Sequence, residues 1–219
     1  PTSGRAWVRG REATRLSSSE RQRLGYLPQA PALFPDLSLD ENLSFHASMY
    51  GLPFRRRKRL DTMLDWVELG EHRRKRVSEV SGGMQRRLAL AAALVHDPDV
   101  VFLDEPTAGI DPILRDRFWT HFRELAGRGV ALVVTTQYVG EAGRCDEVGL
   151  LEDGRLLLRD TPEQLRREAF GGEVVELTLA QPVAAEAAQR LRDEGVVDGA
   201  IEHSDATTVR AVVDDARTA

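Results

Sequence analysis

Two adjacent carboxylates, Asp104 and Glu105, follow an apolar run and have the residue types needed for metal and water chemistry. The run VVFL, residues 100–103, is typical of a buried strand, and open α/β sheets bind ligands at the carboxyl ends of such strands. Asp104 is therefore a candidate to hold Mg²⁺ through water, and Glu105 a candidate to polarise an attacking water molecule. Taken alone, the pair could equally cap a turn.

The triplet Ser81-Gly82-Gly83 precedes a strongly helical segment that the Asp-Pro pair at 97–98 closes. Ser81 stands where a helix N-cap belongs, and the two glycines leave main-chain N–H groups uncovered at the positive end of the helix dipole. This arrangement predicts an anion site, although the same triplet by itself is more often a simple turn. It lies 23 residues before Asp104, with a helix and a proline-bounded loop between.

Strand and helix patterns alternate around these residues. Strand 100–103 is followed by a turn, a helix over about 113–126 and a second apolar strand over 130–136. Near-continuous apolar strands that alternate with helices predict a parallel sheet covered on both faces. Upstream, Ser38 and Glu41 fit a capping box and predict a helix from about Leu39 to Tyr50.

Two further patterns extend this framework. An amphipathic pattern over 54–69 predicts a helix that Gly70 ends. Together with the helices on either side, it defines a helical subdomain over about 38–97. The dipeptide Asp153-Gly154 lies between two apolar runs and predicts a β-hairpin.

The length of 219 residues favours one main domain and a small appendage. We expect the main domain over residues 1–170, and Gly171-Gly172 marks the boundary. Residues 171–219 then form a small α+β extension, complete or cut short, in the order β-α-β-β with its helix at 183–193.

Composition narrows the classes of protein. The net charge of -5 and pI of 5.6 argue against a nucleic-acid binder. The basic runs at 55–59 and 73–76 are interpreted as solvated helix faces. The longest apolar run, 88–95, is far shorter than the roughly 20 residues of a membrane-spanning helix. A lone Cys145 fits a reducing compartment, so we expect a cytoplasmic protein.

Four ordered motifs resemble those of the ATP-binding subunits of ABC transporters. The family's signature sequence resembles residues 81–85, its Walker B strand residues 100–106, its D-loop residues 108–111 and its Q-loop residues 25–29. The resemblance covers roughly residues 4–165. Within the family, the sequence is most similar to subunits that drive drug, lipid or polysaccharide exporters.

The resemblance implies an α/β fold of the P-loop NTPase-like cassette type, with a parallel sheet core and a helical subdomain. It implies that two ATP-binding subunits, identical or different, enclose two ATP molecules and act on a transmembrane permease at the inner face of the cell membrane. Asp104 and Gln29 would hold Mg²⁺, Glu105 would be the general base, and Gln137 occupies the position of the family's switch histidine. The implied ATP-binding residues are Gln29, Ser81, Gly82, Gly83, Met84, Gln85 and Asp111.

The P-loop pattern G-x-x-x-x-G-K-[ST] does not occur in these 219 residues. The chain contains two lysines, Lys58 and Lys75, and neither follows a glycine. Because the family places its P-loop before the region that resembles residues 2–10, we expect the cassette to be N-terminally incomplete. Gln137 is a second departure, since glutamine can donate a hydrogen bond but cannot carry a proton as histidine does.

Three functions remain open at this stage. The chain could be part of an ATPase that powers export, or a non-hydrolytic partner module that lends Ser81 and Gly83 to the ATP of another subunit. A soluble ABC-type factor acting on ribosomes or DNA is the third, but neither a paired cassette nor a long coiled coil accompanies the motifs.

Overall fold

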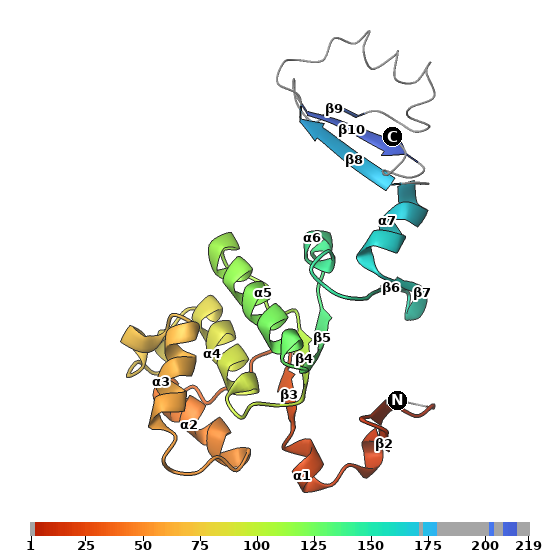
Figure 1. Cartoon of the computed structure of the whole chain (residues 1–219). Helices are drawn as coiled ribbons and strands as arrows, with labels where there is room; N and C mark the ends of the chain where they lie inside the picture. Colours follow the sequence, from red (N-terminus) through yellow and green to blue (C-terminus); the bar gives the residue numbers. More distant parts are fainter. Residues whose placement is uncertain (1–2, 171–172, 179–201, 204–207, 214–219) are drawn as a thin grey trace. The chain divides into compact units, whose positions relative to one another are not determined.

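The computed structural model describes residues 3–170, 173–178, 202–203 and 208–213 (Figure 1). The chain divides into two compact units, Pro1–Gln137 and Tyr138–Ala219. Among the helices within these described ranges, none is both long and apolar enough to cross a membrane.

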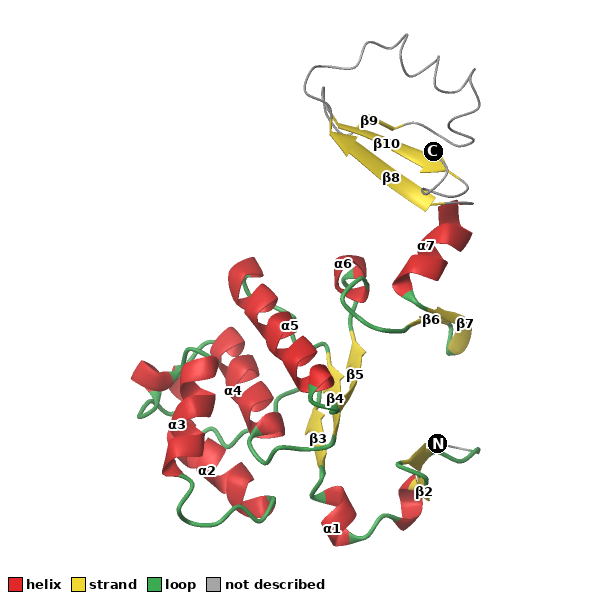
Figure 2. Ribbon diagram, in the orientation of Figure 1, coloured by secondary structure: helices red, strands yellow, loops and turns green. Residues whose placement is uncertain are grey.

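A three-stranded parallel sheet forms the centre of the first unit. Its strands are β3 (Leu24–Leu27), β4 (Val100–Asp104) and β5 (Ala131–Thr135), in the order β3-β4-β5 (Figure 2). The strand expected over 100–103 is the central one, so it is hydrogen-bonded along both edges. The acid pair therefore leaves the sheet between two neighbouring strands.

Two helices pack on this sheet. Helix α4 (Gly82–Leu94) contacts β3, and α5 (Pro112–Gly127) contacts β5. Beneath them, Leu27 and Val101 are 0% exposed and Leu103 is 1% exposed. Burial of such aliphatic side chains contributes roughly 1.5–3 kcal/mol each, so this face forms the core that holds the strands in place.

The other face of the sheet is less covered by the described residues. Tyr26, Phe102 and Val133 are neighbours in register across the three strands, and Tyr26 and Val133 are 59% and 51% exposed. The sequence predicted cover on both faces, whereas the described residues bury one. The reason is the strand order. The connections from β3 to β4 and from β4 to β5 both step in the same direction across the sheet, and right-handed connections that step in one direction lie on the same face.

The helical subdomain follows β3. It contains α2 (Leu39–Met49), α3 (Arg57–Trp66) and the 3₁₀ turns η2 (Gly70–His72) and η3 (Val77–Glu79). The predicted capping box is confirmed, because Ser38 Oγ accepts from the Glu41 amide while Glu41 accepts from the Ser38 amide. Helix α3 is shorter than predicted, since Glu68 adopts a left-handed φ of 57° two residues before Gly70.

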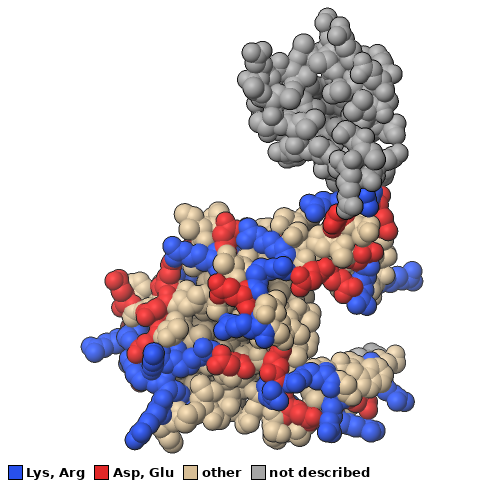
Figure 3. Space-filling view, in the orientation of Figure 1, with Lys and Arg blue, Asp and Glu red and all other residues tan. Residues whose placement is uncertain are grey.

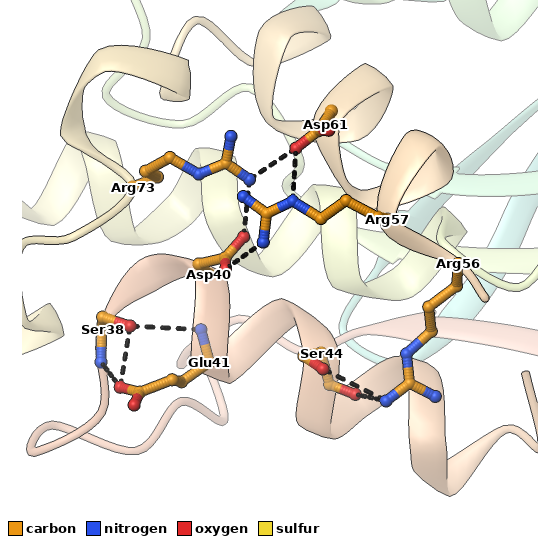
Figure 4. Close-up of polar contacts among 8 residues, drawn as sticks. All are labelled: Ser38, Asp40, Glu41, Ser44, Arg56, Arg57, Asp61 and Arg73. Atoms are coloured by element: carbon orange, nitrogen blue, oxygen red, sulfur yellow. Dashed lines mark hydrogen bonds and ion pairs between the residues drawn. The ribbon is translucent and has the colours of Figure 1, made fainter. Parts of the chain in front are cut away.

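Arginines join the elements of this subdomain (Figure 4). Arg73 Nη2 donates to Asp40 at 2.8 Å and to Asp61 at 2.5 Å, and Arg57 donates to Asp40 at 2.7 Å. Arg56 donates to the main-chain oxygen of Ser44 at 3.0 Å. On the face drawn in Figure 3, blue basic side chains stand among red acidic ones. Arg56 and Arg73 are half-buried links between elements, so the prediction of solvated helix faces was wrong for these two. Arg57 is exposed, as the prediction requires.

Short elements precede the sheet. Strands β1 (Trp7–Val8) and β2 (Arg11–Glu12) pair antiparallel around a turn at Arg9-Gly10, where φ is 52° and 77°. The turn η1 (Ala13–Arg15) and helix α1 (Ser18–Arg21) then lead to β3. Asp99 accepts ion pairs from Arg9 and Arg23, which fixes this segment to the start of β4.

The second unit contains the predicted hairpin. Strands β6 (Val148–Glu152) and β7 (Arg155–Asp160) pair antiparallel, and Asp153 and Gly154 have φ of 47° and 74° as a two-residue hairpin turn requires. This unit also holds α6 (Val139–Ala142), α7 (Pro162–Phe170) and an antiparallel sheet in the order β8-β10-β9, formed by Glu173–Thr178, Thr208–Val213 and Glu202–His203.

Two predictions for the second unit lie outside the described residues. These are the boundary at 171–172 and the helix at 183–193. The assignment of a main domain to residues 1–170 and an extension to 171–219 therefore stays a prediction.

Candidate functional site

The acid pair stands where the sequence predicts it. Asp104 is the last residue of β4, and Glu105 follows with a φ of 48°, a left-handed conformation that turns the chain sharply at the end of the sheet. Both residues are half-buried. A strained main chain at the end of a central strand is a feature of functional sites in α/β proteins.

Thr135, the last residue of β5, holds the acid pair from the neighbouring strand. Its hydroxyl donates to Asp104 Oδ1 at 2.5 Å, and the Glu105 N–H donates to Thr135 Oγ1 at 3.1 Å and to Thr135 O at 3.0 Å. One side chain therefore orients the Asp104 carboxylate and the Glu105 main chain together. Sequence patterns did not mark Thr135, which the parallel register of β4 and β5 places opposite Asp104.

The predicted helix tip is also present. Ser81 is the N-cap of α4 and its hydroxyl accepts from the Met84 N–H at 3.3 Å. Gly82 is exposed, and a Cβ added there would meet nothing within 4 Å. Main-chain N–H groups at such an open helix N-terminus favour an anion such as phosphate.

The loop after the acid pair reaches this helix tip. A Cβ added at Gly83 would lie 3.5 Å from the carbonyl oxygen of Gly109, so the two loops are in near contact. Gly109 has a φ of 70°, which glycine adopts without strain. Beyond it, Asp111 is the N-cap of α5 and accepts from the Leu114 N–H at 3.0 Å.

Arg86 connects the remaining predicted segments. Its side chain lies on α4 and is 6% exposed. Nη1 donates to the carbonyl oxygens of Pro28 and Gln29, and Nη2 donates to those of Asp104 and Glu105. Burial lowers the pKa of the Arg86 guanidinium, and the nearby carboxylates of Asp104 and Glu105 act in the opposite direction. Sequence reasoning did not single out this residue.

Three predicted site residues are glutamines, and they differ in whether their side chains are exposed or hydrogen-bonded. The side chain of Gln29 is exposed, as is Gln137 just after β5. Gln85 Nε2 instead donates to the carbonyl oxygens of Val77 at 3.1 Å and Val80 at 3.3 Å, so its amide group is held within the helical subdomain.

Asn42 fixes the loop that follows Gln29 and was also missed. It is 0% exposed, accepts from the Phe34 N–H at 2.8 Å, and donates to the oxygens of Phe34, Leu37 and Ser38 at 3.0–3.2 Å. Four hydrogen bonds satisfy this buried amide, as burial of a polar group requires.

The donor set fits magnesium bound together with a phosphate. Within the described parts of the chain, no three His, Cys, Asp or Glu side chains are grouped to hold a metal by themselves. Mg²⁺ is commonly held by one or two carboxylates together with phosphate oxygens, which is what Asp104 and Glu105 could offer. A carboxylate pair and an open helix tip at one edge of a parallel sheet define a phosphate-binding α/β domain.

Comparison with known proteins identifies the family. Residues 1–108 match the sequence family described as ABC transporter. The chain is 37% identical over 182 residues to the probable multidrug ABC transporter ATP-binding protein YbhF of Escherichia coli (strain K12), covering 83% of this chain and 32% of that protein. It is 38% identical over 183 residues to the daunorubicin resistance ATP-binding protein DrrA3 of Streptomyces coeruleorubidus, covering 83% of this chain and 58% of that protein.

The fold gives the same result. The chain resembles the solved structure of an ATP-binding subunit of an ABC transporter with a TM-score of 0.67 and 26% sequence identity, over 74% of this chain and 68% of that one. The chain belongs to the ABC transporter family and carries an ATP-binding domain of that family. The predicted family and α/β fold class are thereby confirmed. This chain spans 32% and 58% of the lengths of the two curated relatives.

Proposed function

We propose that this chain contributes to an ATP-hydrolysing subunit of an ABC exporter. The observation that carries the proposal is the juxtaposition built by Arg86, whose guanidinium binds the carbonyls of Gln29, Asp104 and Glu105 from the helix that begins at Ser81. The Q-loop, the Walker B acids and the signature helix are thus directly connected, as a shared nucleotide site needs. The names of the relatives, multidrug and daunorubicin resistance proteins, support export as the process.

In this proposal, each residue has a chemical role. Asp104 holds Mg²⁺ through water, with Gln29 as a second ligand, and Glu105 accepts the proton of the attacking water. The amides of Gly82 and Gly83, with the Ser81 hydroxyl, bind the γ-phosphate of an ATP molecule held by a second subunit. Gln137 orients that water or phosphate by hydrogen bonding but carries no proton, which favours slow hydrolysis.

The 219 residues contain no P-loop pattern, so we propose that this chain by itself does not hold ATP. A second ATP-binding subunit that contains a P-loop supplies the ATP that faces Ser81. A transmembrane permease is the membrane partner, and the chain is placed peripherally at the inner face of the membrane. Met84, Gln85 and Asp111 support the two contact loops in this arrangement.

ATP-dependent association tests the proposal. The purified chain is titrated with Mg-ATP alone and then mixed with an ATP-binding subunit that contains a P-loop, and complex formation is followed by analytical ultracentrifugation. We expect a complex with ATP and none with ADP. The Gly82→Asp variant, which places a carboxylate at the open helix tip, should abolish the complex, whereas Gly127→Asp at the distant end of α5 should not. ATP-independent association, or equal behaviour of both variants, would overturn the proposal.

A second candidate is a non-hydrolytic partner module, favoured by Gln137 at the position of the family's switch histidine. The Glu105→Gln variant distinguishes the two. For this chain alone we expect no change, because no γ-phosphate is bound. When a P-loop segment from a relative is fused before this chain, loss of hydrolysis on Glu105→Gln supports the ATPase function, and hydrolysis that does not depend on Glu105 supports the partner module.

A further inference from the structure

The Arg86 guanidinium joins two segments that lie far apart in the sequence. Nη1 donates to Pro28 O at 2.6 Å and to Gln29 O at 2.8 Å, while Nη2 donates to Glu105 O at 2.8 Å and also to Asp104 O. All four acceptors are main-chain carbonyl oxygens. The contact therefore fixes the path of both loops rather than the rotamer of any one side chain.

We propose that Arg86 is a positioning residue that makes the helix tip at Ser81, the Gln29 loop and the acid pair move as one unit. The inference rests on the proposed function. When ATP held by a second subunit binds the Ser81 tip of α4, Arg86 passes that change to Gln29 and Glu105 of this chain. The state of one nucleotide site thereby sets the geometry at the other.

Helix geometry supports this coupling. Arg86 lies five residues after Ser81 on the same helix, a separation of about 7.5 Å along the axis. An α-helix of this length moves as a rigid element over such a short distance, so a shift of the tip also shifts the base of the Arg86 side chain. The guanidinium then carries the shift into both loops through four hydrogen bonds.

Energetics make the four hydrogen bonds interdependent. Arg86 is 6% exposed, and its four hydrogen bonds within the described residues all go to carbonyls rather than to a carboxylate. Its Nε has no hydrogen-bond partner among these residues. Carbonyl dipoles, together with the nearby carboxylates of Asp104 and Glu105, offset the cost of burying the charge. Withdrawal of either loop would leave a buried cation half-satisfied, so the low-energy arrangement keeps both loops attached.

Only a planar fork can make this contact. Guanidinium offers five N–H donors in fixed directions, whereas the lysine ammonium is a compact point charge that cannot reach two separate pairs of carbonyls. Arg87 is the matched control, because it follows on the same helix but donates to Val67 O at 3.0 Å and faces Glu68. Arg87→Lys keeps the charge and leaves the two loops untouched.

The first test uses the wild-type chain and native-state hydrogen exchange. The reporters are the Leu33 amide, which donates to Pro31 O beside the Gln29 loop, and the Ala108 amide, which donates to Glu105 O. If Arg86 joins the loops, the two amides exchange through one shared opening with the same dependence on urea. Separate openings overturn the proposal. This measurement needs no variant and decides the matter even if Arg86→Lys does not fold.

The second test adds an ATP-binding subunit that contains a P-loop and Mg-ATP. In the wild type we expect ATP to slow exchange at Gln85, in the first turn of α4, and at Leu33 and Ala108. In Arg86→Lys the protection at Gln85 remains, whereas that at Leu33 and Ala108 falls by about tenfold or more, the value of one to two hydrogen bonds. Arg87→Lys should behave as wild type.

The outcomes separate the two proposals. ATP-induced protection of Leu33 and Ala108 that survives Arg86→Lys overturns the role of Arg86. If ATP does not protect Gln85 in the wild type, the result counts against the proposed function. In that case the first test, on the chain alone, decides whether Arg86 joins the two loops.

Discussion

His96 gives a prediction with a magnitude, because burial lowers its pKa from 6.5 to about 4. The imidazole stacks on the Tyr50 ring, with centroids 3.6 Å apart and planes within 3°. Its Nε2 lies 3.1 Å from Leu24 O, so this nitrogen carries the proton of the neutral ring, and its Nδ1 has no hydrogen-bond partner among the described residues. The folded protein therefore holds His96 in the neutral form.

The sign follows from the lowered pKa. Above pH 6.5 the ring is neutral in the folded and unfolded states, and the full stability is present. As the pH falls towards 4, the unfolded chain binds a proton that the folded chain does not, so the free energy of unfolding decreases. At pH 5 the loss is about 2 kcal/mol by linkage, and roughly 1 to 2 kcal/mol once the exposed part of the half-buried ring is allowed for.

Urea unfolding between pH 7 and pH 5 measures this loss. His96→Phe retains an aromatic ring against Tyr50 but does not titrate, so its unfolding free energy should fall with pH by about 1 to 2 kcal/mol less than that of the wild type. Tyr50→Phe keeps the stacked ring and the histidine, and should show the pH dependence of the wild type. Equal slopes for His96→Phe and the wild type would refute the reasoning.

Three further predictions concern side chains that hold main-chain groups. Arg59→Met removes hydrogen bonds to the last carbonyls of α4 and should lower the free energy of unfolding by about 1–3 kcal/mol in urea, whereas exposed Lys58→Met should change it by less than about 0.5 kcal/mol. Asn42→Ala should lower the free energy of unfolding by about 2–4 kcal/mol and speed chymotrypsin cleavage at Phe34, because Asn42 holds the Phe34 main chain. Unchanged cleavage would contradict this role of Asn42. Thr135→Val should leave the unfolding free energy within about 1 kcal/mol. In a fusion that places a P-loop segment before this chain, the substitution should reduce hydrolysis on the order of tenfold, and undiminished turnover would argue against orientation of the acid pair.

Local signals in the sequence predicted the ends of several elements correctly. The caps at Ser38 and Ser81 depend on a hydroxyl three residues before the amide it accepts from, which is a relation that sequence displays directly. The Asp153-Gly154 turn is local in the same sense. The end of α3 was misplaced because Glu68 adopts a left-handed conformation that the sequence suggested only for Gly70.

The residues that assemble the site were harder to predict because their partners are main-chain atoms. Thr135, Asn42 and Arg86 all bind main-chain groups, which every residue supplies and no pattern marks. Arg86 and Arg87 are adjacent and identical in type, yet one contacts two loops of the site and the other contacts Val67. Only the rotation of α4 about its axis distinguishes them.

Binding to main-chain groups also explains why this chain uses arginine rather than lysine. Of 30 basic residues only two are lysines. Arg56, Arg59 and Arg86 each donate to two or more main-chain oxygens, which requires several N–H groups in fixed directions. Lysine would keep the net charge and lose these links. The run at 55–59 thus combines exposed side chains with Arg56 and Arg59, which bind main-chain oxygens of other elements, and a count of charges alone does not distinguish the two.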